Sequence, residues 1–414
     1  MKKILSLFLC CLMVLTLTGC GGSSGDDITT YTYSSELDIK NLDSSDADDG
    51  CSLKAIHAVI DGLTKTDKKG NIVNAVAKSE ELSEDGLTHT YKLRKDVKWT
   101  NGDPVTAHDF VYAWQRIFRK KGSYYYMFAD GIASIEGAQE LSDKIDAGEE
   151  LTDDDLNSMG VKAIDDYTLE VKTTVRVSFF DELMAFPCFF PINEKFCEKQ
   201  GDKYGKSAKA ILGNGAFIMT NWEPGSIAEF KKNEDYYEAK TVKIEKLVMK
   251  LVQDPKVAAQ SFMAGETDYA PITSDLVDKY KDDESFKQVP EGFLYYLSVN
   301  FQNEDLANAN IRQAVSLSIN RKDLCEKVLK DGSSAATGFI PKGVATSPDG
   351  KDFREESGTY ITYSQSKAQQ ALDRGLKELG KSEIKLRITY GTDESPMDVI
   401  ATYLQNALSK LKGI

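Results

Sequence analysis

Histidine is scarce in this sequence, and its scarcity excludes several kinds of catalytic and metal site. Only three of the 414 residues are histidine, namely His57, His89 and His108. None of them belongs to an H-E-x-x-H zinc-protease pattern, and no G-x-S-x-G segment marks a nucleophile elbow. The sequence therefore points to no catalytic group, and we expect a protein that is not an enzyme.

Cysteines in metal-binding or redox spacing are also absent. Beyond the first 20 residues the chain has four cysteines: Cys51, Cys188, Cys197 and Cys325. They lack C-x-x-C spacing, so no structural zinc site is expected. Disulfides can form outside the cell, but their pairing cannot be read from one sequence.

Basic charge is in deficit, and phosphate- and calcium-binding loops are missing. The chain has 51 Lys and Arg against 65 Asp and Glu, and this acidic balance argues against a nucleic-acid partner. Segment 201–207 (GDKYGKS) has three residues between its glycines, where a phosphate loop has four. The acidic runs at 46–49 and 153–155 lack the Gly and the final Glu of a calcium loop, so we interpret them as solvated surface or helix starts. No cofactor or metal is expected.

Only one long apolar run is present, and it lies at the N-terminus. Lys2 and Lys3 precede the 14-residue segment Ile4–Leu17, which is shorter than the roughly 20 apolar residues of a membrane span. Residues 1–19 therefore read as a secretory signal peptide that ends in the lipobox LTGC, with Cys20 as the lipidated residue. Residues 20–27 are a polar, flexible tether. We expect an exported protein on the outer face of the cytoplasmic membrane that touches the membrane only through its lipid.

The remaining sequence alternates strand and helix patterns irregularly, as in a mixed α/β protein with more than one lobe. Strict alternation predicts strands at 88–93, 216–220, 227–231, 293–301 and 384–390, and a hairpin over 161–174 that turns at Asp165-Asp166. Thr106 to Asp109 has capping-box spacing, and a 3.6-residue period follows it. Further helices are expected at 311–319, about 321–330 and 400–411.

Several blocks resemble one known family. Residues 86–107 (GLTHTYKLRKDVKWTNGDPVTA) are similar to the signature of the family-5 extracellular solute-binding proteins of ABC importers. Shorter blocks follow in the family's order: NGAF at 214–217, NEDYY at 233–237, FMAGETD at 262–268 and IRQA at 311–314. The IRQA block is followed by Asn320 where the family has Asp at a helix cap, and these two residues cap about equally well. The oligopeptide-binding branch is the most similar.

The resemblance implies a two-lobed clamp of the periplasmic-binding-protein-like (type II) class with an extra inserted subdomain. The first lobe is expected to be discontinuous, over residues 28–63 and 185–292. The inserted subdomain takes residues 64–184, and the second lobe takes 293–414 after a hinge of crossing strands. Closure of the lobes would trap a ligand between them.

The resemblance also implies a function and a site. The ligand would be a short peptide held by its backbone, and the partners would be the permease and ATPase subunits of an ABC importer, with the binding protein itself a monomer. Candidate ligand-binding residues are Glu36, Trp222, Tyr295, Tyr296 and Asn300. Packing in the core is the alternative role for each of them.

The C-terminal pattern favours an incomplete second lobe, because a strand and a helix at 384–411 are half of a crossover unit. Family members continue with a segment that receives the amino group of the peptide, and no residue here matches it. We therefore expect the 414-residue chain alone to bind peptides only weakly.

Other functions fit the same residues. The same fold could bind a nickel chelate, haem or an oligosaccharide, although three histidines weigh against bare metal. A non-transporting surface or sensor protein would keep the clamp for signalling. An exported hydrolase would need a carboxylate pair that no motif singles out.

Overall fold

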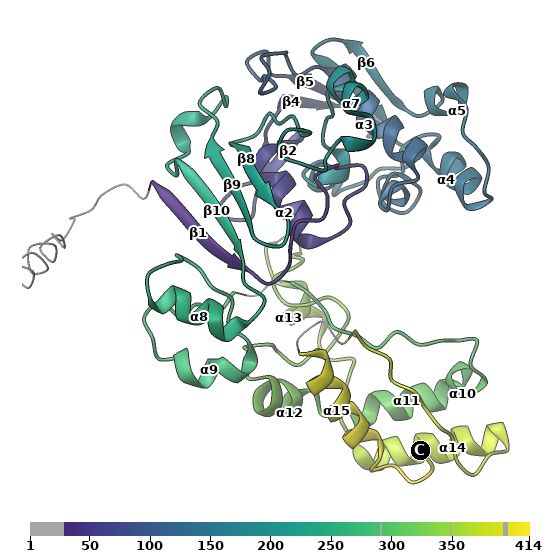
Figure 1. Ribbon diagram of the computed structural model, residues 1–414. Helices are drawn as coiled ribbons and strands as arrows, with labels where there is room; N and C mark the ends of the chain where they lie inside the picture. Colours follow the sequence, from purple (N-terminus) through teal and green to yellow (C-terminus); the bar gives the residue numbers. More distant parts are fainter. Residues whose placement is uncertain (1–28, 290–291, 348, 392–395) are drawn as a thin grey trace, which may run out of the picture. The chain divides into compact units, whose positions relative to one another are not determined.

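The computed structural model describes residues 29–289, 292–347, 349–391 and 396–414, which form two compact units (Figure 1). The first unit ends at Pro271 and the second begins at Ile272. The predicted signal peptide, the predicted lipidation site Cys20 and the predicted tether lie outside the described residues. Among the described helices, none has both the length and the apolar character that a membrane span requires.

A four-stranded sheet, here called sheet A, organises one half of the first unit. Its strands follow the order β1 (Thr30–Ser35), β10 (Lys246–Leu251), β9 (Ile227–Lys232) and β8 (Phe217–Glu223). β1 is parallel to β10, and the other neighbours are antiparallel. Helix α2 (Gly50–Val59) begins at the N-cap Asp49 and shares a core with one face of this sheet. The strand pair predicted around 216–231 is confirmed as β8 and β9.

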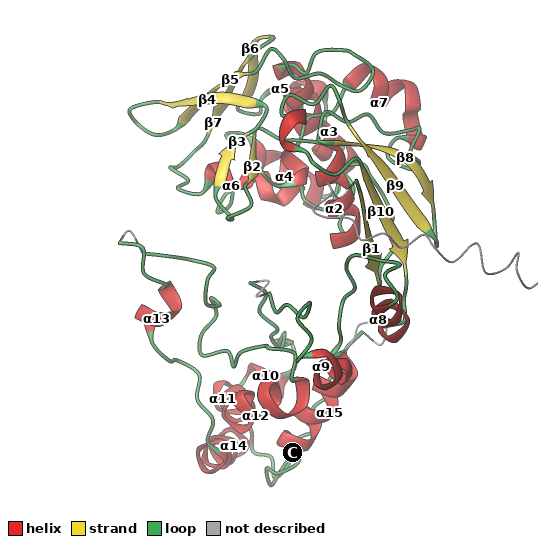
Figure 2. Ribbon diagram, turned by 90° about the vertical axis from the view of Figure 1, so that its left-hand side faces the viewer, coloured by secondary structure: helices red, strands yellow, loops and turns green. Residues whose placement is uncertain are grey.

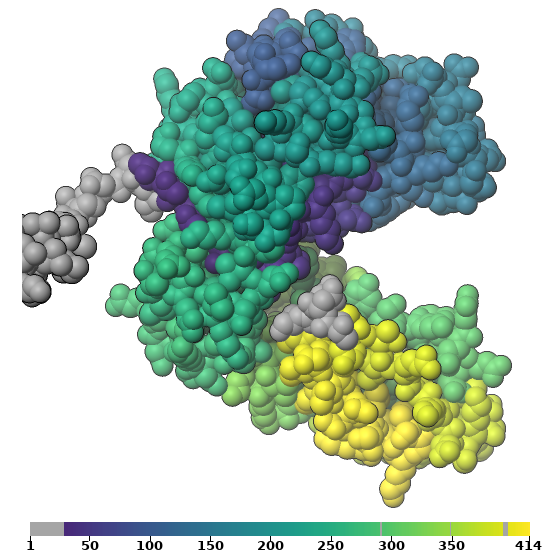
Figure 3. Space-filling model, in the orientation of Figure 1, coloured from purple at the N-terminus to yellow at the C-terminus, as the bar shows by residue number. Residues whose placement is uncertain are grey.

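A second four-stranded sheet, here called sheet C, organises residues 77–172. Its order is β4 (Ala77–Leu82), β5 (Thr88–Leu93), β7 (Thr168–Lys172) and β6 (Val161–Asp165), all antiparallel. The predicted strand at 88–93 and the predicted hairpin are both confirmed. In Figure 3 these blue and blue-teal residues gather on one side of the first unit. The minor elements here are β2 (Thr64–Thr66), β3 (Ile72–Asn74), α4 (Ala138–Asp146), α5 (Asp153–Asn157), α6 (Phe180–Leu183), η1 (Tyr125–Phe128) and η2 (Pro187–Phe189).

Helix α3 (Ala107–Lys120) supplies most of the core beside sheet C. Its capping box forms as predicted between Thr106 and Asp109, and the helix ends at Lys121, which has a φ of 52°. The predicted apolar face is confirmed, since all of its side chains are at most 1% exposed: Phe110, Ala113, Trp114, Ile117 and Phe118. The acidic runs also start helices, because Asp49 caps α2 and residues 153–155 form the first turn of α5.

Two buried polar groups tie the parts of the first unit together. Arg116 of α3 donates two hydrogen bonds of 2.7 Å to the Asp43 carboxylate, and both side chains are almost fully buried. Asp61 accepts hydrogen bonds of 2.7 Å from the hydroxyls of Tyr236 and Tyr237, while Lys65 lies 3.8 Å from the same carboxylate oxygen. Pairing of this kind is what makes buried charge tolerable. The remaining elements of this unit are α7 (Glu194–Gln200), η3 (Gly201–Lys203), η4 (Ala239–Thr241) and α8 (Pro255–Met263).

The second unit consists of helices and loops in its described residues (Figure 2). Its core is the contact of α11 (Ala309–Ser318) with α14 (Gln365–Leu379), where Gly375 lets Ile311 approach closely. The helices predicted at 311–319, 321–330 and 400–411 are confirmed, the second as a short α-helix capped by Asn320 and followed by a π-helical turn. The other elements are α9 (Ser274–Tyr280), α10 (Glu304–Ala307), α12 (Arg321–Asp323), η5 (Leu324–Leu329), α13 (Phe353–Ser357) and α15 (Met397–Leu408).

Two strand predictions in this unit are wrong. Segments 293–301 and 384–390 alternate in sequence, but the structure forms no strand there. Alternation decides which face a side chain would take, whereas a strand also needs a neighbour to satisfy its N–H and C=O groups. Neither segment has such a neighbour among the described residues. The structure thus forms no strand at residue 293, and the hinge of crossing strands stays a prediction.

Candidate functional site

Two of the predicted ligand-binding residues, Glu36 and Trp222, lie at the same end of sheet A but on its two opposite edges. Strand register places Tyr33, Met249, Ala228 and Trp222 in one row across the sheet, from β1 to β8. Glu36 follows the last residue of β1, so it lies at the same end of the sheet as Trp222. Because β1 and β8 are the two edges, three strand spacings of about 4.8 Å separate their backbones.

Polar groups gather at the end of β1, where Glu36 lies, and the Asp38 carboxylate is among them. The Glu36 carboxyl is half-buried, and this burial raises its pKa. The Ser35 hydroxyl donates 2.6 Å to the Leu37 carbonyl, and the Cys51 thiol donates 3.1 Å to the same oxygen. Burial also raises the pKa of the Cys51 thiol, and it raises the pKa of Tyr33 to about 12. The Tyr33 phenol and the Cys51 thiol therefore stay protonated at physiological pH, so these two groups suit hydrogen bonding better than acid–base catalysis.

Trp222 has features of both a core residue and a binding residue. Its half-buried ring packs against the core that sheet A shares with α2. Its indole N–H, however, is buried and has no hydrogen-bond partner among the described residues. A buried donor without a partner is unfavourable, so a ligand that accepts this hydrogen bond would gain affinity. Sequence reasoning missed Tyr33 and Cys51 as neighbours of this site, because strand register brings Tyr33 there and the packing of α2 on sheet A brings Cys51 there.

The other three predicted residues lie in the second unit, in an irregular segment. Tyr295 and Tyr296 are about 70% exposed, and the Tyr296 ring lies 6.2 Å from the ring of Phe339. The Asn300 side chain accepts a hydrogen bond of 2.9 Å from the backbone N–H of Gln302 and so forms a local turn. Within its unit, the structure does not gather these three side chains into a pocket, and their ligand contact stays a prediction.

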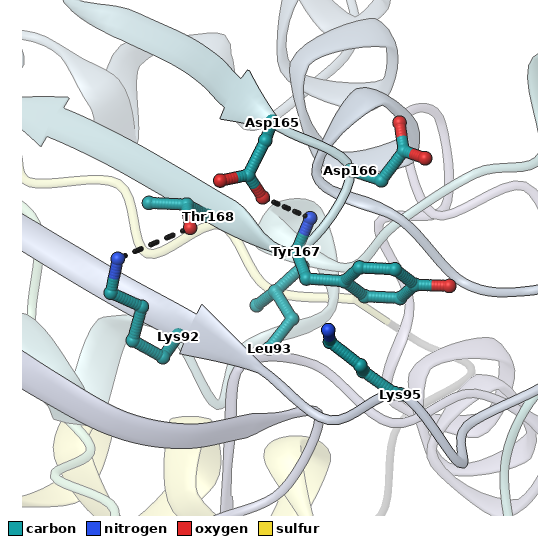
Figure 4. Close-up of a pocket in the computed structure, with 7 residues that line it drawn as sticks. All are labelled: Lys92, Leu93, Lys95, Asp165, Asp166, Tyr167 and Thr168. Carbon is teal, nitrogen blue, oxygen red and sulfur yellow. Dashed lines mark hydrogen bonds between the residues drawn. The ribbon is translucent and has the colours of Figure 1, made fainter.

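A separate hollow of about 620 Å³ lies beside the turn between β6 and β7 (Figure 4). Asp165 accepts a hydrogen bond of 2.8 Å from the backbone of Tyr167, and Lys92 donates 3.2 Å to the Thr168 hydroxyl. Lys95 lies 5.2 Å from the centre of the Tyr167 ring. These contacts stabilise the hairpin turn. The hollow belongs to sheet C, not to the sheet that carries Glu36 and Trp222.

The described side chains offer no catalytic or metal constellation. The three histidines come from α2, β5 and α3, so the fold does not gather them; His89 pairs with Glu80 at 2.5 Å and the exposed His108 pairs with Asp166 at 3.4 Å. No group of three or more His, Cys, Asp or Glu side chains in this part of the chain is placed to hold a metal ion. The four cysteines in the described ranges are free thiols.

Comparison with known proteins gives a consistent family. The model of the bacterial extracellular solute-binding proteins, family 5 (Middle), matches residues 71–414. The dipeptide-binding protein DppE of Bacillus subtilis is 32% identical over 364 residues, covering 88% of this chain and 65% of its own length. The oligopeptide-binding protein OppA of the same organism is 30% identical over 435 residues, covering 100% of this chain and 77% of its own. The chain thus spans about two thirds to three quarters of the length of these relatives.

A solved structure agrees in fold. The structure titled Listeria monocytogenes OppA bound to peptide superposes with a TM-score of 0.80 and 30% identity, covering 94% of this chain and 76% of that one. The similarity confirms the predicted mixed α/β fold of the two-lobed, periplasmic-binding type.

Proposed function

The chain belongs to the bacterial extracellular solute-binding proteins of family 5, and from that premise we propose that it is the peptide-binding component of an ABC importer. The observation that carries the proposal is the fold match over 94% of the chain to a protein solved with a bound peptide. The relatives named for dipeptides and oligopeptides support the same ligand class. A family of solute-binding proteins also agrees with the expectation of a carrier without enzymatic activity.

The end of sheet A suits a peptide backbone. Tyr33, Ser35 and Cys51 carry protonated polar groups near the end of β1, which the half-buried Glu36 follows directly in the chain. The Trp222 indole is a buried donor that has no protein partner in the described residues. A peptide carries both carbonyl acceptors and N–H donors, so it can use all of these groups without a charged side chain of its own. We assign Glu36 and Trp222 to this site and keep Tyr295, Tyr296 and Asn300 as proposed contacts from the second unit.

The proposal places the protein outside the cell. A basic start, one apolar run and the lipobox LTGC support export and lipidation at Cys20, and the permease and ATPase subunits of the importer would be its partners. Replacement Cys20→Ser should release the protein from the membrane fraction and abolish labelling by a radioactive fatty acid. Continued labelling of that variant would contradict lipidation at this residue.

Thermal unfolding of the full chain in detergent, with and without a pool of short peptides, tests the ligand. A ligand that binds only the folded state stabilises it by RT ln(1 + [L]/Kd), which is about 2.7 kcal/mol at a hundredfold excess over Kd. The unfolding temperature should therefore rise with peptide, and the rise should grow with peptide concentration. An oligosaccharide pool and a nickel chelate serve as matched alternatives. A shift with either of them and none with peptides would favour another solute, and no shift with any ligand would favour the non-transporting role.

Trp222→Phe and Glu36→Gln locate the site in the same assay. Phenylalanine keeps the ring that packs in the core but removes the N–H donor, so the melting point without ligand should stay close to that of the parent protein. The response to peptides should fall. An unchanged response would remove the end of sheet A from the binding site.

A further inference from the structure

Residues 36–39, here called the crossing segment, run from one edge strand of sheet A toward the other. The chain leaves β1 at Ser35, and Asp38 follows three residues later, a length of extended chain that covers about 10 Å. One Asp38 carboxylate oxygen accepts a hydrogen bond of 2.6 Å from the backbone N–H of Gly225, in the turn between β8 and β9. Since β1 and β8 are the opposite edges of the sheet, the crossing segment spans its end (Figure 1).

The crossing segment is also attached to helix α2 on both sides of Asp38. The Leu37 carbonyl accepts a hydrogen bond of 3.1 Å from the Cys51 thiol. The Ser52 hydroxyl accepts a hydrogen bond of 2.9 Å from the backbone N–H of Lys40. Asp38 is thus the point at which a segment held by β1 and α2 touches the β8–β9 turn.

Both oxygens of the Asp38 carboxylate have backbone partners inside the protein. One accepts from Gly225, and the other accepts a hydrogen bond of 2.8 Å from the backbone N–H of Ile39. The Ile39 side chain is 2% exposed and packs in the core that sheet A shares with α2. Hydrogen bonds to a carboxylate are about twice as strong as those between neutral groups. Asp38 is therefore suited to hold the crossing segment in place rather than to contact a ligand.

The β8–β9 turn is a firm anchor for Asp38, because the hairpin holds it without help. Gly225 has a φ of 79°, which glycine adopts without strain. The backbone N–H of Ser226 donates 3.0 Å to the Glu223 carbonyl and closes the turn. The Ser226 carbonyl also accepts a hydrogen bond of 2.8 Å from Leu251, at the end of β10. Loss of the Asp38 carboxylate should therefore free the crossing segment and leave the turn in place.

We propose that Asp38 is a positioning residue of the peptide site, which holds Glu36 over the end of sheet A so that Glu36 and Trp222 contact the same ligand. The inference rests on the proposed function, since it takes a peptide as the ligand and these two residues as its contacts. Glu36 lies two residues before Asp38, and Trp222 lies three residues before Gly225. A contact that is already in place costs no ordering free energy when the ligand binds, so the bridge from Asp38 to Gly225 raises affinity.

Amide hydrogen exchange of the full chain tests the bridge without any ligand. In Asp38→Ala the Gly225 amide should exchange about tenfold to a hundredfold faster, as expected for the loss of a hydrogen bond to a charged group. The Ser226 amide, whose bond lies inside the hairpin, is the internal reference and should keep its rate. Lys40→Ala removes an exposed side chain next to the crossing segment and should leave both rates unchanged. An unchanged Gly225 rate in Asp38→Ala would overturn the bridge.

Thermal unfolding with the pool of short peptides tests the positioning role. Asp38→Ala should need about threefold to tenfold more peptide than the parent for the same rise in unfolding temperature. Glu36→Gln should weaken the response of the parent but add little to the loss in Asp38→Ala, because Glu36 is no longer held in place there. If Asp38 only stabilised the fold, Glu36→Gln would have the same effect in both backgrounds, and that result would overturn the positioning role.

Asp38→Asn separates the hydrogen bond from the charge, and it also serves if Asp38→Ala folds poorly. Its amide keeps one acceptor oxygen, so its Gly225 exchange rate and its peptide response should both lie between those of the parent and Asp38→Ala. A lost peptide response with a protected Gly225 amide would mean that the charge acts instead of the bridge, which contradicts the proposal.

Failure of this inference is distinct from failure of the proposed function. A parent chain that does not respond to peptides would overturn the proposed function and the positioning role together. A parent that responds, with an equal response in Asp38→Ala, would overturn the positioning role alone.

Discussion

The two units differ in how completely their apolar residues are buried. In the first unit the alternating segments become paired strands, and the large aromatic side chains of α3 are fully buried. In the second unit the alternating segments 293–301 and 384–390 stay irregular. Several of their aromatic residues are exposed, among them Phe293 at 74% and Phe301 at 62%. Similar sequence patterns thus produce a closed core in one region and an open surface in another, because strands require neighbours whereas helices satisfy their own backbone.

The largest expected effect comes from truncating one aromatic residue in each unit. Trp114→Ala removes a ring that is 0% exposed, packs edge-on against Phe128 and Phe189, and donates 3.0 Å to the Phe189 carbonyl. It should lower the free energy of unfolding by about 3–5 kcal/mol. Tyr296→Ala, at a side chain 70% exposed, should change it by less than about 0.5 kcal/mol.

Urea unfolding measures this contrast, read by tryptophan fluorescence for the first unit, which holds Trp99, Trp114 and Trp222, and by far-ultraviolet circular dichroism for the helical second unit. The Trp114→Ala variant keeps Trp99 and Trp222 as fluorescent reporters of unfolding. A loss above about 2 kcal/mol from Tyr296→Ala would mean that its ring is buried in the folded protein, contrary to the structure.

Loss of an ion pair should also lower the free energy of unfolding more in the first unit than in the second. Arg116→Met leaves the Asp43 carboxylate buried without its partner and should cost about 3–5 kcal/mol. In the second unit, Lys381 pairs with Asp305 at 2.6 Å from a more exposed position, and Lys381→Met should cost less than about 1 kcal/mol. Adding Asp43→Asn to Arg116→Met should recover part of the loss, since it removes the stranded charge. Equal losses of unfolding free energy for Arg116→Met and Lys381→Met would contradict this difference between the two units.

The charge inside the α3 capping box should make the first unit sensitive to pH. Burial raises the pKa of Asp109 from 3.8 to about 6. A raised folded value means that this stabilisation is complete below 3.8 and is lost as pH rises through about 6. At about 1.4 kcal/mol per pKa unit, Asp109→Asn should remove up to about 3 kcal/mol of the pH dependence between pH 4 and 8. Urea unfolding midpoints of the parent and of Asp109→Asn at several pH values, read by tryptophan fluorescence, check this prediction. If the midpoints of the two proteins change with pH in the same way, Asp109 is not the source of the pH dependence.

Much of this architecture could be predicted from local chemistry. The capping-box spacing of Thr106 and Asp109 predicted the start of α3. Alternation of polar and apolar residues located β5 and the β6–β7 hairpin to within a few residues. Two things could not be read in this way. The row from Tyr33 to Trp222 depends on strand order, which joins residues almost 190 positions apart in sequence. The irregular state of 293–301 depends on whether a neighbouring strand is present, and no property of the segment itself reveals that.

The smallest effect concerns the helix pair that forms the core of the second unit. A Cβ on Gly375 would come within 2.6 Å of Cδ1 of Ile311, so Gly375→Ala should overpack this contact by about 1–3 kcal/mol. Alanine also raises helix propensity by about 1 kcal/mol, which leaves a net loss of roughly 1 kcal/mol. Amide exchange of α11 and α14 measures it, and Gly50→Ala, where a Cβ meets nothing within 4 Å, is the control. Ile311→Val deletes Cδ1 itself, so the double variant should lose less than the sum of the two single losses. Strict additivity would mean that the two helices lie farther apart than the structure places them.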